Sequence, residues 1–399
     1  MDIRGFQLTR LPEDFFDDPY RYYAARREQN PLHELEGGGI FVSRYDDALA
    51  VYRDERASSD KKLEFKPKFG DSPLYEHHTT SLVFNDPPLH TRVRRIIMGA
   101  LNQRAIARME AQVVTLVNCL LEEMGEKECV NFIDDFAARI PVEVIGNLLD
   151  IPHAARGPLR GWSIAILSGL EPKLTPQMFE TGNRAVSEFV AFLKDLIAER
   201  RRKPGDPDSD VLTRLIRGEE DGAQLTETEL HHQCIFLLNA GHETTTNLIG
   251  NGLCALLNNE DQMKMLRESP SLVGSAIEEM LRYDGPIQLN NRRLTAPMEL
   301  GGRTLAAGTL ITIGIGAANR DPRQFPDPDR FDVARRPNRH IAFGQGAHAC
   351  AGMNVARMEG RIALGALLAR FGRIEPDGAP ERDRRVRFRG FRRFPVRVG

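Results

Sequence analysis

The sequence predicts a mainly helical protein with a smaller β-sheet region, and three observations favour this α+β class. Apolar residues recur at helical spacing over most of 86–283 and again over 351–370. Shorter strand patterns separated by turn residues lie at roughly 30–60, 285–340 and 375–399. One predicted helix starts at Thr226 and, at 1.5 Å per residue, is about 50 Å long, enough to cross a whole domain.

Composition limits the class of protein further. The chain has 399 residues with a net charge of −2, which gives no basic footprint for nucleic acid. Its five cysteines are an odd number without zinc-site spacing, which favours a reducing cytoplasm. The sequence shows neither a signal peptide nor an apolar run long enough for a bilayer. We therefore expect a soluble, cytoplasmic, monomeric protein with one domain over 1–399.

The first elements are short. Helices are predicted at Tyr20–Glu28 and Tyr45–Arg53, on either side of a hairpin at Leu32–Ser43. Residues 57–85 then lose periodicity, and this segment is predicted to be irregular. A long irregular segment is either a binding loop or lid, or a merely solvated loop, and the pattern favours neither.

The long helix is locally unusual in its middle. Thr226 and Glu229 form a T-x-x-E capping box at its start. Gly241 costs about 1 kcal/mol relative to alanine, and the three threonines 244–246 are mediocre helix formers. Functional sites tend to break local propensity in this way, so we expect one at mid-helix.

The last third of the chain alternates strands and helix. Strands are predicted at Gln288–Leu294, Met298–Leu300 and Thr309–Gly316. A final amphipathic helix is predicted from about Ala351 to Arg370, with a short strand tail after it. The basic stretch Arg382–Arg397 is interpreted as solvated surface or as a face for an acidic partner.

Cys350 is the main candidate for chemistry. Gly344 and Gly346 predict a tight loop before it, and it then stands at the start of the final helix. Unpaired N–H groups there favour an anion and are expected to lower the thiol pKa. Such a thiolate suits a nucleophile, a redox thiol or a metal ligand. No second cysteine is near for a redox pair, and the spacing of His348 does not by itself supply a base.

The run Phe343–Gly352 resembles the F-G-x-G-x-H-x-C-x-G haem-binding signature of the cytochrome P450 superfamily. The resemblance implies that Cys350 is the proximal iron ligand of haem b (iron protoporphyrin IX), with Phe343 and Gly344 in the haem-binding loop. A thiolate ligand pushes electron density toward iron and favours O–O cleavage.

A second segment, Ala240–Thr245, resembles the A/G-G-x-D/E-T-T pattern over the distal haem face of the same family. It implies that Thr244 hydrogen-bonds the bound oxygen or its water and that Glu243 relays protons. Gly241, beside Ala240, would let the ligand approach the helix closely. Without the resemblance, a threonine cluster on a helix surface explains the segment equally well.

Two further sets of residues resemble the family in the same chain order. Glu279 and Arg282 share one helix face and, with Arg330, are implied to form a buried structural triad. Haem propionates need positive partners, and the resemblance implies that these are the following residues: His90, Arg94, Arg292 and His348. Arg293 competes with Arg292 for this role, and the alternative for Arg94 is a plain surface charge.

The resemblance extends from about Asp18 to the C-terminus and implies a monooxygenase. Such an enzyme hydroxylates or O-dealkylates a small to medium hydrophobic molecule with O₂ and two electrons from a ferredoxin and its reductase. The ferredoxin is expected on the thiolate side, near Arg92, Arg95, Arg104 and Arg357. A peroxide-driven peroxygenase and a haem-thiolate sensor without turnover are the alternatives. The Glu243–Thr244 pair argues against the first, and the lack of a visible regulatory domain against the second.

By the same resemblance, the substrate pocket draws on these residues: Leu82, Phe236, Asn239, Ala240, Ile287, Gln288 and Phe388. They are mostly apolar with two amides, which suits a hydrophobic molecule that carries one polar group. A minority hypothesis pairs the lysines of residues 61–68, above all Lys66 and Lys68, with a carboxylate of the substrate.

Overall fold

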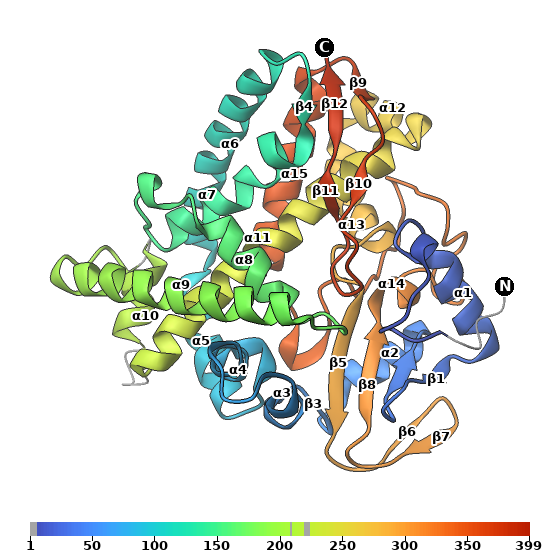
Figure 1. The fold of residues 1–399 in the computed structure, drawn as a ribbon. Coiled ribbons are helices and arrows are strands. Elements are labelled where there is room, and N and C mark those ends of the chain that lie inside the picture. Colours follow the sequence, from blue (N-terminus) through green and yellow to red (C-terminus); the bar gives the residue numbers. More distant parts are fainter. Residues whose placement is uncertain (1–5, 208–209, 219–223) are drawn as a thin grey trace.

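The computed structural model describes residues 6–207, 210–218 and 224–399. Helices fill one side of the molecule and the largest sheet lies on the other (Figure 1). Helix α11 (Glu227–Leu257) runs through the middle (Figure 1). This mainly helical architecture with small sheets is the predicted one. No helix in the described ranges is both long and apolar enough to cross a membrane.

The other α-helices have the following bounds: α1 (Tyr20–Gln29), α2 (Tyr45–Arg53), α3 (Lys62–Phe69), α4 (Pro73–Thr80), α5 (Leu89–Ala100), α6 (Gln103–Gly125), α7 (Arg139–Leu148), α8 (Leu159–Ser168), α9 (Pro176–Arg202), α10 (Val211–Arg217), α12 (Glu260–Glu268), α13 (Val273–Tyr283), α14 (Ile315–Ala318) and α15 (Met353–Arg370). Short 3₁₀ or π turns are η1 (Glu13–Phe15), η2 (Leu82–Phe84), η3 (Ile133–Ala137), η4 (His153–Ala155), η5 (Pro270–Leu272) and η6 (Gly346–His348).

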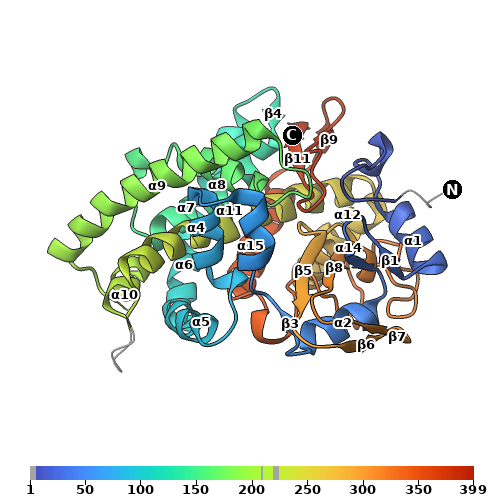
Figure 2. The ribbon, with the colours of Figure 1, turned by 60° about the horizontal axis from the view of Figure 1, so that its bottom comes forward.

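The largest sheet has the strand order β1-β2-β8-β5-β3, in which only β2 and β8 pair in parallel. Its strands are β1 (Leu32–Glu34), β2 (Ile40–Val42), β3 (Ala57–Ser58), β5 (Leu289–Leu294) and β8 (Leu310–Gly314). The smaller sheets use β4 (Val130–Asn131), β6 (Met298–Leu300), β7 (Arg303–Leu305), β9 (Ile374–Pro376), β10 (Glu381–Arg382), β11 (Phe391–Arg393) and β12 (Pro395–Val398). Turned by 60°, the molecule shows β5 and β8 side by side next to α2 (Figure 2).

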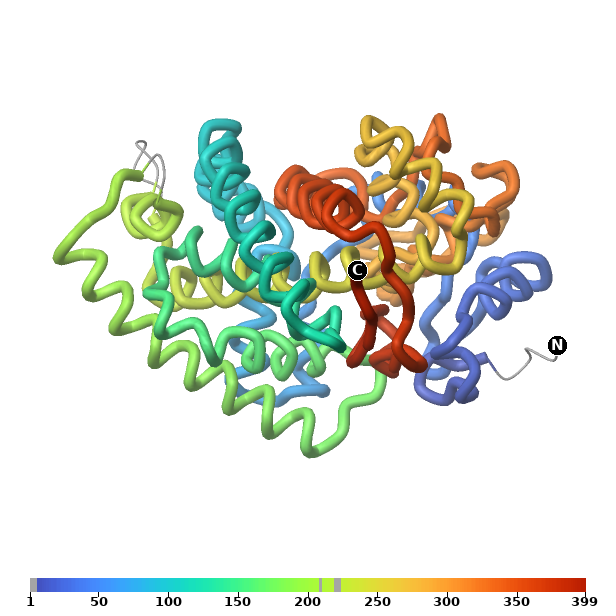
Figure 3. Tube along the Cα trace, turned by 90° about the horizontal axis from the view of Figure 1, so that it is seen from above, coloured from blue at the N-terminus to red at the C-terminus, as the bar shows by residue number. Residues whose placement is uncertain are grey.

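Helix α11 begins where the capping box predicts. The Thr226 side chain accepts from Glu229 N at 3.2 Å, and Glu229 Oε2 accepts from Thr226 N at 2.8 Å. Most of the helix is buried, because α7, α8, α9 and α15 pack around it. Seen from above, α11 crosses the molecule with α15 lying against it (Figure 3). Any site at the middle of α11 is therefore built on a core element of the fold.

Gly241 of α11 allows α7 to pack closely against this helix. A Cβ atom at this position would lie 2.6 Å from Cδ1 of Ile145 on α7. A side chain at this position would require Ile145 to shift, so Gly241 also serves the packing of α7 against α11, and its role beside a bound ligand stays a prediction.

The prediction of an irregular segment over 57–85 was wrong. Helices α3 and α4 occupy most of it. Tertiary packing decides this, because Phe65, Phe69 and Leu74 are buried in the main core despite the weak helical pattern. One local signal was available: Ser72 caps α4 by accepting from Tyr75 N at 3.3 Å, and a proline follows it at the first helical position.

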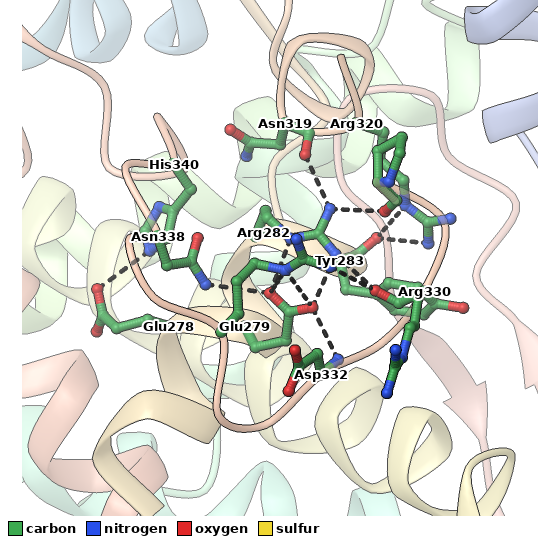
Figure 4. A network of polar contacts seen from close by, with 12 residues as sticks. Glu278, Glu279, Arg282, Tyr283, Asn319, Arg320, Arg330, Asp332, Asn338 and His340 are labelled. Atoms are coloured by element: carbon green, nitrogen blue, oxygen red, sulfur yellow. Dashed lines mark hydrogen bonds and ion pairs between the residues drawn. The ribbon is translucent and has the colours of Figure 1, made fainter. Parts of the chain in front are cut away.

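An ion-pair network around the fully buried pair Glu279–Arg282 joins α13 to the chain before the cysteine loop (Figure 4). Arg282 Nε and Nη2 donate to the two carboxylate oxygens of Glu279 at 2.7 and 2.8 Å. Nη1 and Nη2 of the same arginine donate to the carbonyls of Asn319, Pro328 and Arg330. This network fixes the path of the segment 319–338.

The third side chain of the network differs from the prediction. Arg335 Nε donates to both oxygens of Glu279 at 3.1 Å. Arg330 is exposed and contributes only its backbone carbonyl, and its side chain points away from the pair (Figure 4). The spacing of an arginine in the sequence does not reveal which of several nearby arginines turns inward.

We expect Glu279→Gln to lower the free energy of unfolding by about 3–5 kcal/mol, because it leaves two buried guanidinium groups without their counter-ion. Urea unfolding followed by circular dichroism measures the change. The control is Lys264→Met, which removes an exposed pair with Glu268 and is expected to cost less than about 0.5 kcal/mol. An unchanged urea midpoint for Glu279→Gln would contradict the assigned role of the network.

Candidate functional site

The cysteine loop, residues 341–352, folds back on itself before α15. Gly344 and Gly346 adopt φ of +66° and +72°, and a Cβ on Gly346 would lie 2.5 Å from the carbonyl oxygen of Tyr52. Cys350 N donates to the Phe343 carbonyl at 2.9 Å, which closes the loop. The predicted tight loop is therefore present, and both glycines are needed for its path.

The predicted acidity of the Cys350 thiol was wrong. Burial raises its pKa, against the lowering effects of a backbone hydrogen bond at Gly352 and of the charges of Arg94 and Arg357. The start of α15, with Gly352 as its N-cap, is thus not enough to make a thiolate. A cation bound directly to the sulfur deprotonates such a thiol outright, whereas a nucleophile needs a thiolate in advance. The geometry favours a metal ligand.

Two arginines and two histidines gather beside this loop. The His90 and His348 rings lie 4.0 Å apart between centroids, and Arg94 Nη2 donates to the Ala349 carbonyl at 2.8 Å. The guanidinium of Arg292 is buried and lies 5.4 Å from the ring centroid of Tyr52. Burial, His90 and the two arginines lower the pKa of His348 to about 3. The positive charge here therefore comes from the two arginines, while the neutral histidines offer ring N–H donors.

The same four residues fit the two carboxylates of a haem. His90 Nε2 is buried and has no hydrogen-bond partner among the described residues. The neighbouring acid, Asp86, lies 3.9 Å from His348 Nε2, but it already accepts from Ser59 N at 2.9 Å. Carboxylates accept charge-assisted hydrogen bonds from such groups.

Strand geometry separates Arg292 from Arg293. Successive side chains of β5 point to opposite faces of the sheet. The guanidinium of Arg293 lies beside Gly308, on the other side from Tyr52. Of the two candidates, Arg292 is therefore the one beside the cysteine loop.

One stripe of α11 is accessible although the helix around it is buried. Ala240 is exposed, while Phe236, Gly241 and Thr244 are half-buried. Positions 236, 240 and 244 share one helix face, so this face of the otherwise buried helix is accessible. Thr244 Oγ1 donates to the Ala240 carbonyl at 2.7 Å. A small residue and a hydroxyl thus lie on the accessible stripe, in the segment for which the sequence predicted a distal face.

Glu243 is turned to an arginine that the sequence analysis did not single out. Its Oε1 is paired with Arg385 Nη2, which also contacts Asp383 at 2.6 Å. Its Oε2 is buried and has no hydrogen-bond partner in the described part of the chain. Arg385 belongs to the basic stretch interpreted as surface, and charge alone does not show that a residue turns inward.

The structure brings some of the predicted pocket residues together. Ile287 and Phe388 pair as a β-bridge, and Leu82 N donates to Gln233 Oε1 at 3.1 Å, one helical turn from Phe236. The Asn239 amide meets His77 Nε2 at 3.3 Å.

Gln288 turns away from the other pocket residues. Its amide nitrogen donates to the Gly285 carbonyl at 2.8 Å and to the Tyr20 hydroxyl at 3.3 Å. The amide is thereby committed to the network around Tyr20, and the expectation that Gln288 lines the pocket gains no support.

The basic residues expected on the thiolate side are largely engaged within the chain. Arg92 pairs with Glu229, and Arg357 Nε donates to Glu278 Oε1 at 2.7 Å. Arg104 is exposed. Two of the four arginines expected to contact a ferredoxin are thus paired with acids of this chain.

Comparison with known proteins gives one consistent answer. The family model described as "Cytochrome P450" matches residues 166–387. The chain is 36% identical over 411 residues to "6-deoxyerythronolide B hydroxylase" of Saccharopolyspora erythraea, covering 98% of this chain and 100% of that protein. It is also 36% identical over 372 residues to a "Cytochrome P450" of Bacillus subtilis, covering 91% and 89%.

Solved structures agree. "P450BioI in complex with hexadec-9Z-enoic acid ligated Acyl Carrier Protein" matches with a TM-score of 0.91 at 32% identity, covering 97% of this chain and 99% of that chain. The myxobacterial CYP267B1 in complex with myristic acid matches with a TM-score of 0.89 at 34% identity, covering 97% and 98%.

We expect the haem-free protein to react with iodoacetamide at Cys350 only at pH values above those for free cysteine, because burial raises the pKa of this thiol. The pH profile of peptide mass spectra measures this reaction, and reconstitution with haem is expected to abolish it. Rapid alkylation at neutral pH would contradict the assignment and favour a nucleophile.

Proposed function

The chain belongs to the cytochrome P450 family, and from that premise we propose that Cys350 is the axial ligand of its haem. The chain is a P450 monooxygenase, and its family implies a cysteine-ligated haem, electrons from a redox partner and small-molecule substrates. The observation that carries the assignment of Cys350 is its place at the end of a glycine loop, beside Arg94, Arg292 and the unpartnered Nε2 of His90.

Each residue of the site has a role in this proposal. His90, Arg94, Arg292 and His348 hold the propionates by charge and hydrogen bonding. Phe343, over whose ring Arg357 lies at 4.7 Å, and Gly344 shape the proximal loop. Ala240 and Gly241 form the small-residue wall of α11 on the distal side.

Haem ligated by a thiolate supplies the centre at which dioxygen is reduced and one oxygen atom is transferred to the substrate. Thr244 presents a hydroxyl to this side while bonded to the Ala240 carbonyl, and its lone pairs can accept a further hydrogen bond. Glu243 can relay a proton only when its carboxylate leaves Arg385. Proton delivery is thereby tied to the position of one arginine.

We further propose a ferredoxin with its reductase as the electron source, docked on the proximal face, a cytoplasmic location and one P450 domain over 1–399. The substrate in this proposal is a small to medium hydrophobic molecule that is hydroxylated or O-dealkylated. Phe236, Ile287 and Phe388 provide apolar contact area for it.

Replacing the ligand tests the proposal directly. We expect Cys350→Ser to lose the absorption band of the reduced CO complex that marks thiolate ligation, because an alcohol does not replace the thiolate electronically. The control Cys119→Ser, at an exposed position on α6, is expected to keep the band. Retention of the band by Cys350→Ser would overturn the assignment.

Thr244→Ala tests the distal role. With a ferredoxin system and a substrate that shifts the haem spin state, product formed per NADH is expected to fall about tenfold or more while NADH oxidation continues. The control Thr246→Ala removes the same kind of bond, to the His242 carbonyl at 3.0 Å, from a buried position off the accessible stripe.

Equal losses in the Thr244→Ala and Thr246→Ala variants would assign both threonines to helix structure. Product formed from hydrogen peroxide faster than from NADH would favour the peroxygenase alternative. A thiolate band without turnover of any compound that shifts the spin state would favour the sensor.

A further inference from the structure

Four arginines of the stretch Arg382–Arg397 turn inward, whereas the others in it are exposed. Arg382 and Arg389 both pair with the buried carboxylate of Asp284. Arg385 and Arg387 turn inward as well, but toward the region between α11 and the start of β5. The segment 383–390, which connects β10 to β11, thus carries two inward cations that Asp284 does not bind.

Arg385 has hydrogen-bonding capacity to spare. Its side chain is 9% exposed, and its Nη2 forms ion pairs with the carboxylates of both Glu243 and Asp383. Its Nε and Nη1 are buried without a hydrogen-bond partner among the residues described. Leaving such donors unpaired is costly, which indicates that another group binds them in the working protein.

Arg387 is half-buried, and burial lowers the pKa of its guanidinium. Its guanidinium donates to the carbonyls of Leu170 and Leu289 at 3.1 and 3.2 Å and to Asn291 Oδ1 at 2.6 Å. All three acceptors are neutral, so these bonds fix its position without neutralising it.

Lys68 approaches the same place from α3. Its Nζ donates to the Glu171 carbonyl at 2.8 Å, and burial together with the charge of Arg387 lowers its pKa to about 8. The Glu171 carboxylate accepts from the backbone N–H groups of Val386 and Arg387, at 2.8 and 3.2 Å. Lys68 and the segment 383–390 therefore both contact Glu171. Lys66, by contrast, is exposed and pairs with Asp71.

The cationic cluster, defined as Lys68, Arg385 and Arg387, borders the proposed distal side. Arg385 contacts Glu243, the neighbour of Thr244 on α11, and Phe388 in the same segment pairs with Ile287. Three acids, Glu171, Asp383 and Glu243, lie among the cations. The cluster therefore offers a ligand unused hydrogen-bond donors rather than net positive charge.

We propose that the substrate is an organic acid whose carboxylate binds to Arg385 and Lys68, with its apolar body directed toward Phe388 and the accessible stripe of α11. The proposal rests on the proposed function and names the substrate class of that site. An incoming carboxylate satisfies the open nitrogens of Arg385 by charge-assisted hydrogen bonds.

The test is a spin-state titration of the haem-loaded protein with octanoic, dodecanoic, adamantane-1-carboxylic and 4-ethylbenzoic acids, each against its primary amide. In the parent protein, at least one acid is expected to shift the spin state at a concentration tenfold or more below that of its amide. Charged hydrogen bonds of this kind account for a difference of about tenfold.

Lys68→Met and Arg385→Gln are each expected to weaken that acid about tenfold or more and to leave its amide unchanged. Lys66→Met, on the same helix but exposed, is the matched control and is expected to leave both affinities unchanged. If Arg385→Gln does not fold, Lys68→Met decides the outcome alone.

The proposal is overturned if no acid binds better than its amide, if no acid shifts the spin state, or if Lys68→Met leaves acid affinity unchanged. The CO band of the reduced protein, recorded for each variant, distinguishes failure of the proposed function from failure of the proposed substrate class. Its absence in the parent protein overturns the proposed function itself. Its presence without a preference for acids overturns only the substrate class.

Discussion

The placement of the cysteine loop depends on the ion pairs that the buried carboxylate of Glu279 makes. It binds Arg282 and Arg335 at once, and Arg282 in turn holds three carbonyls of the segment that precedes the loop. Asn319, held by one of these bonds, accepts from Ile341 N at 2.8 Å, where the loop begins. Because uncompensated charge in the interior is so unfavourable, the geometry has little freedom. The position of Cys350 is therefore set by a network whose atoms lie in another part of the chain.

Helix α11 forms the opposite boundary of the site. Its capping box fixes where it begins, and the close approach of α7 at Gly241 fixes its depth in the core. Nearly all its faces are buried, so the stripe at Phe236, Ala240 and Thr244 stands out as accessible. A long, fully packed helix is a rigid support for a distal wall, and it tolerates mediocre helix formers such as threonine because tertiary contacts compensate for local propensity.

Buried positive charge is used in two separate places. Beside the cysteine loop, burial and the charges of Arg94 and Arg292 lower the pKa values of His90 and His348. On the other side, Arg385 and Arg387 enter from the segment 383–390 and Lys68 from α3. We propose the first group as the partners of the two carboxylates of haem. The second group has unused donors beside Glu243, which is why we connect it to the charge of the substrate rather than to the cofactor.

The sequence alone determined the family, the cysteine, the distal motif and the long capped helix, because each is encoded in contiguous residues whose local chemistry is sufficient. It did not determine which charged side chains turn inward. Arg335 in place of Arg330, the inward arginines of the C-terminal stretch, and Lys68 rather than Lys66 all depend on contacts between segments far apart in the chain. The same holds for the pKa of Cys350, since burial by distant segments outweighs the effect of the helix that follows it. Only the tertiary structure decides these points, because desolvation and ion pairing arise when the chain is packed.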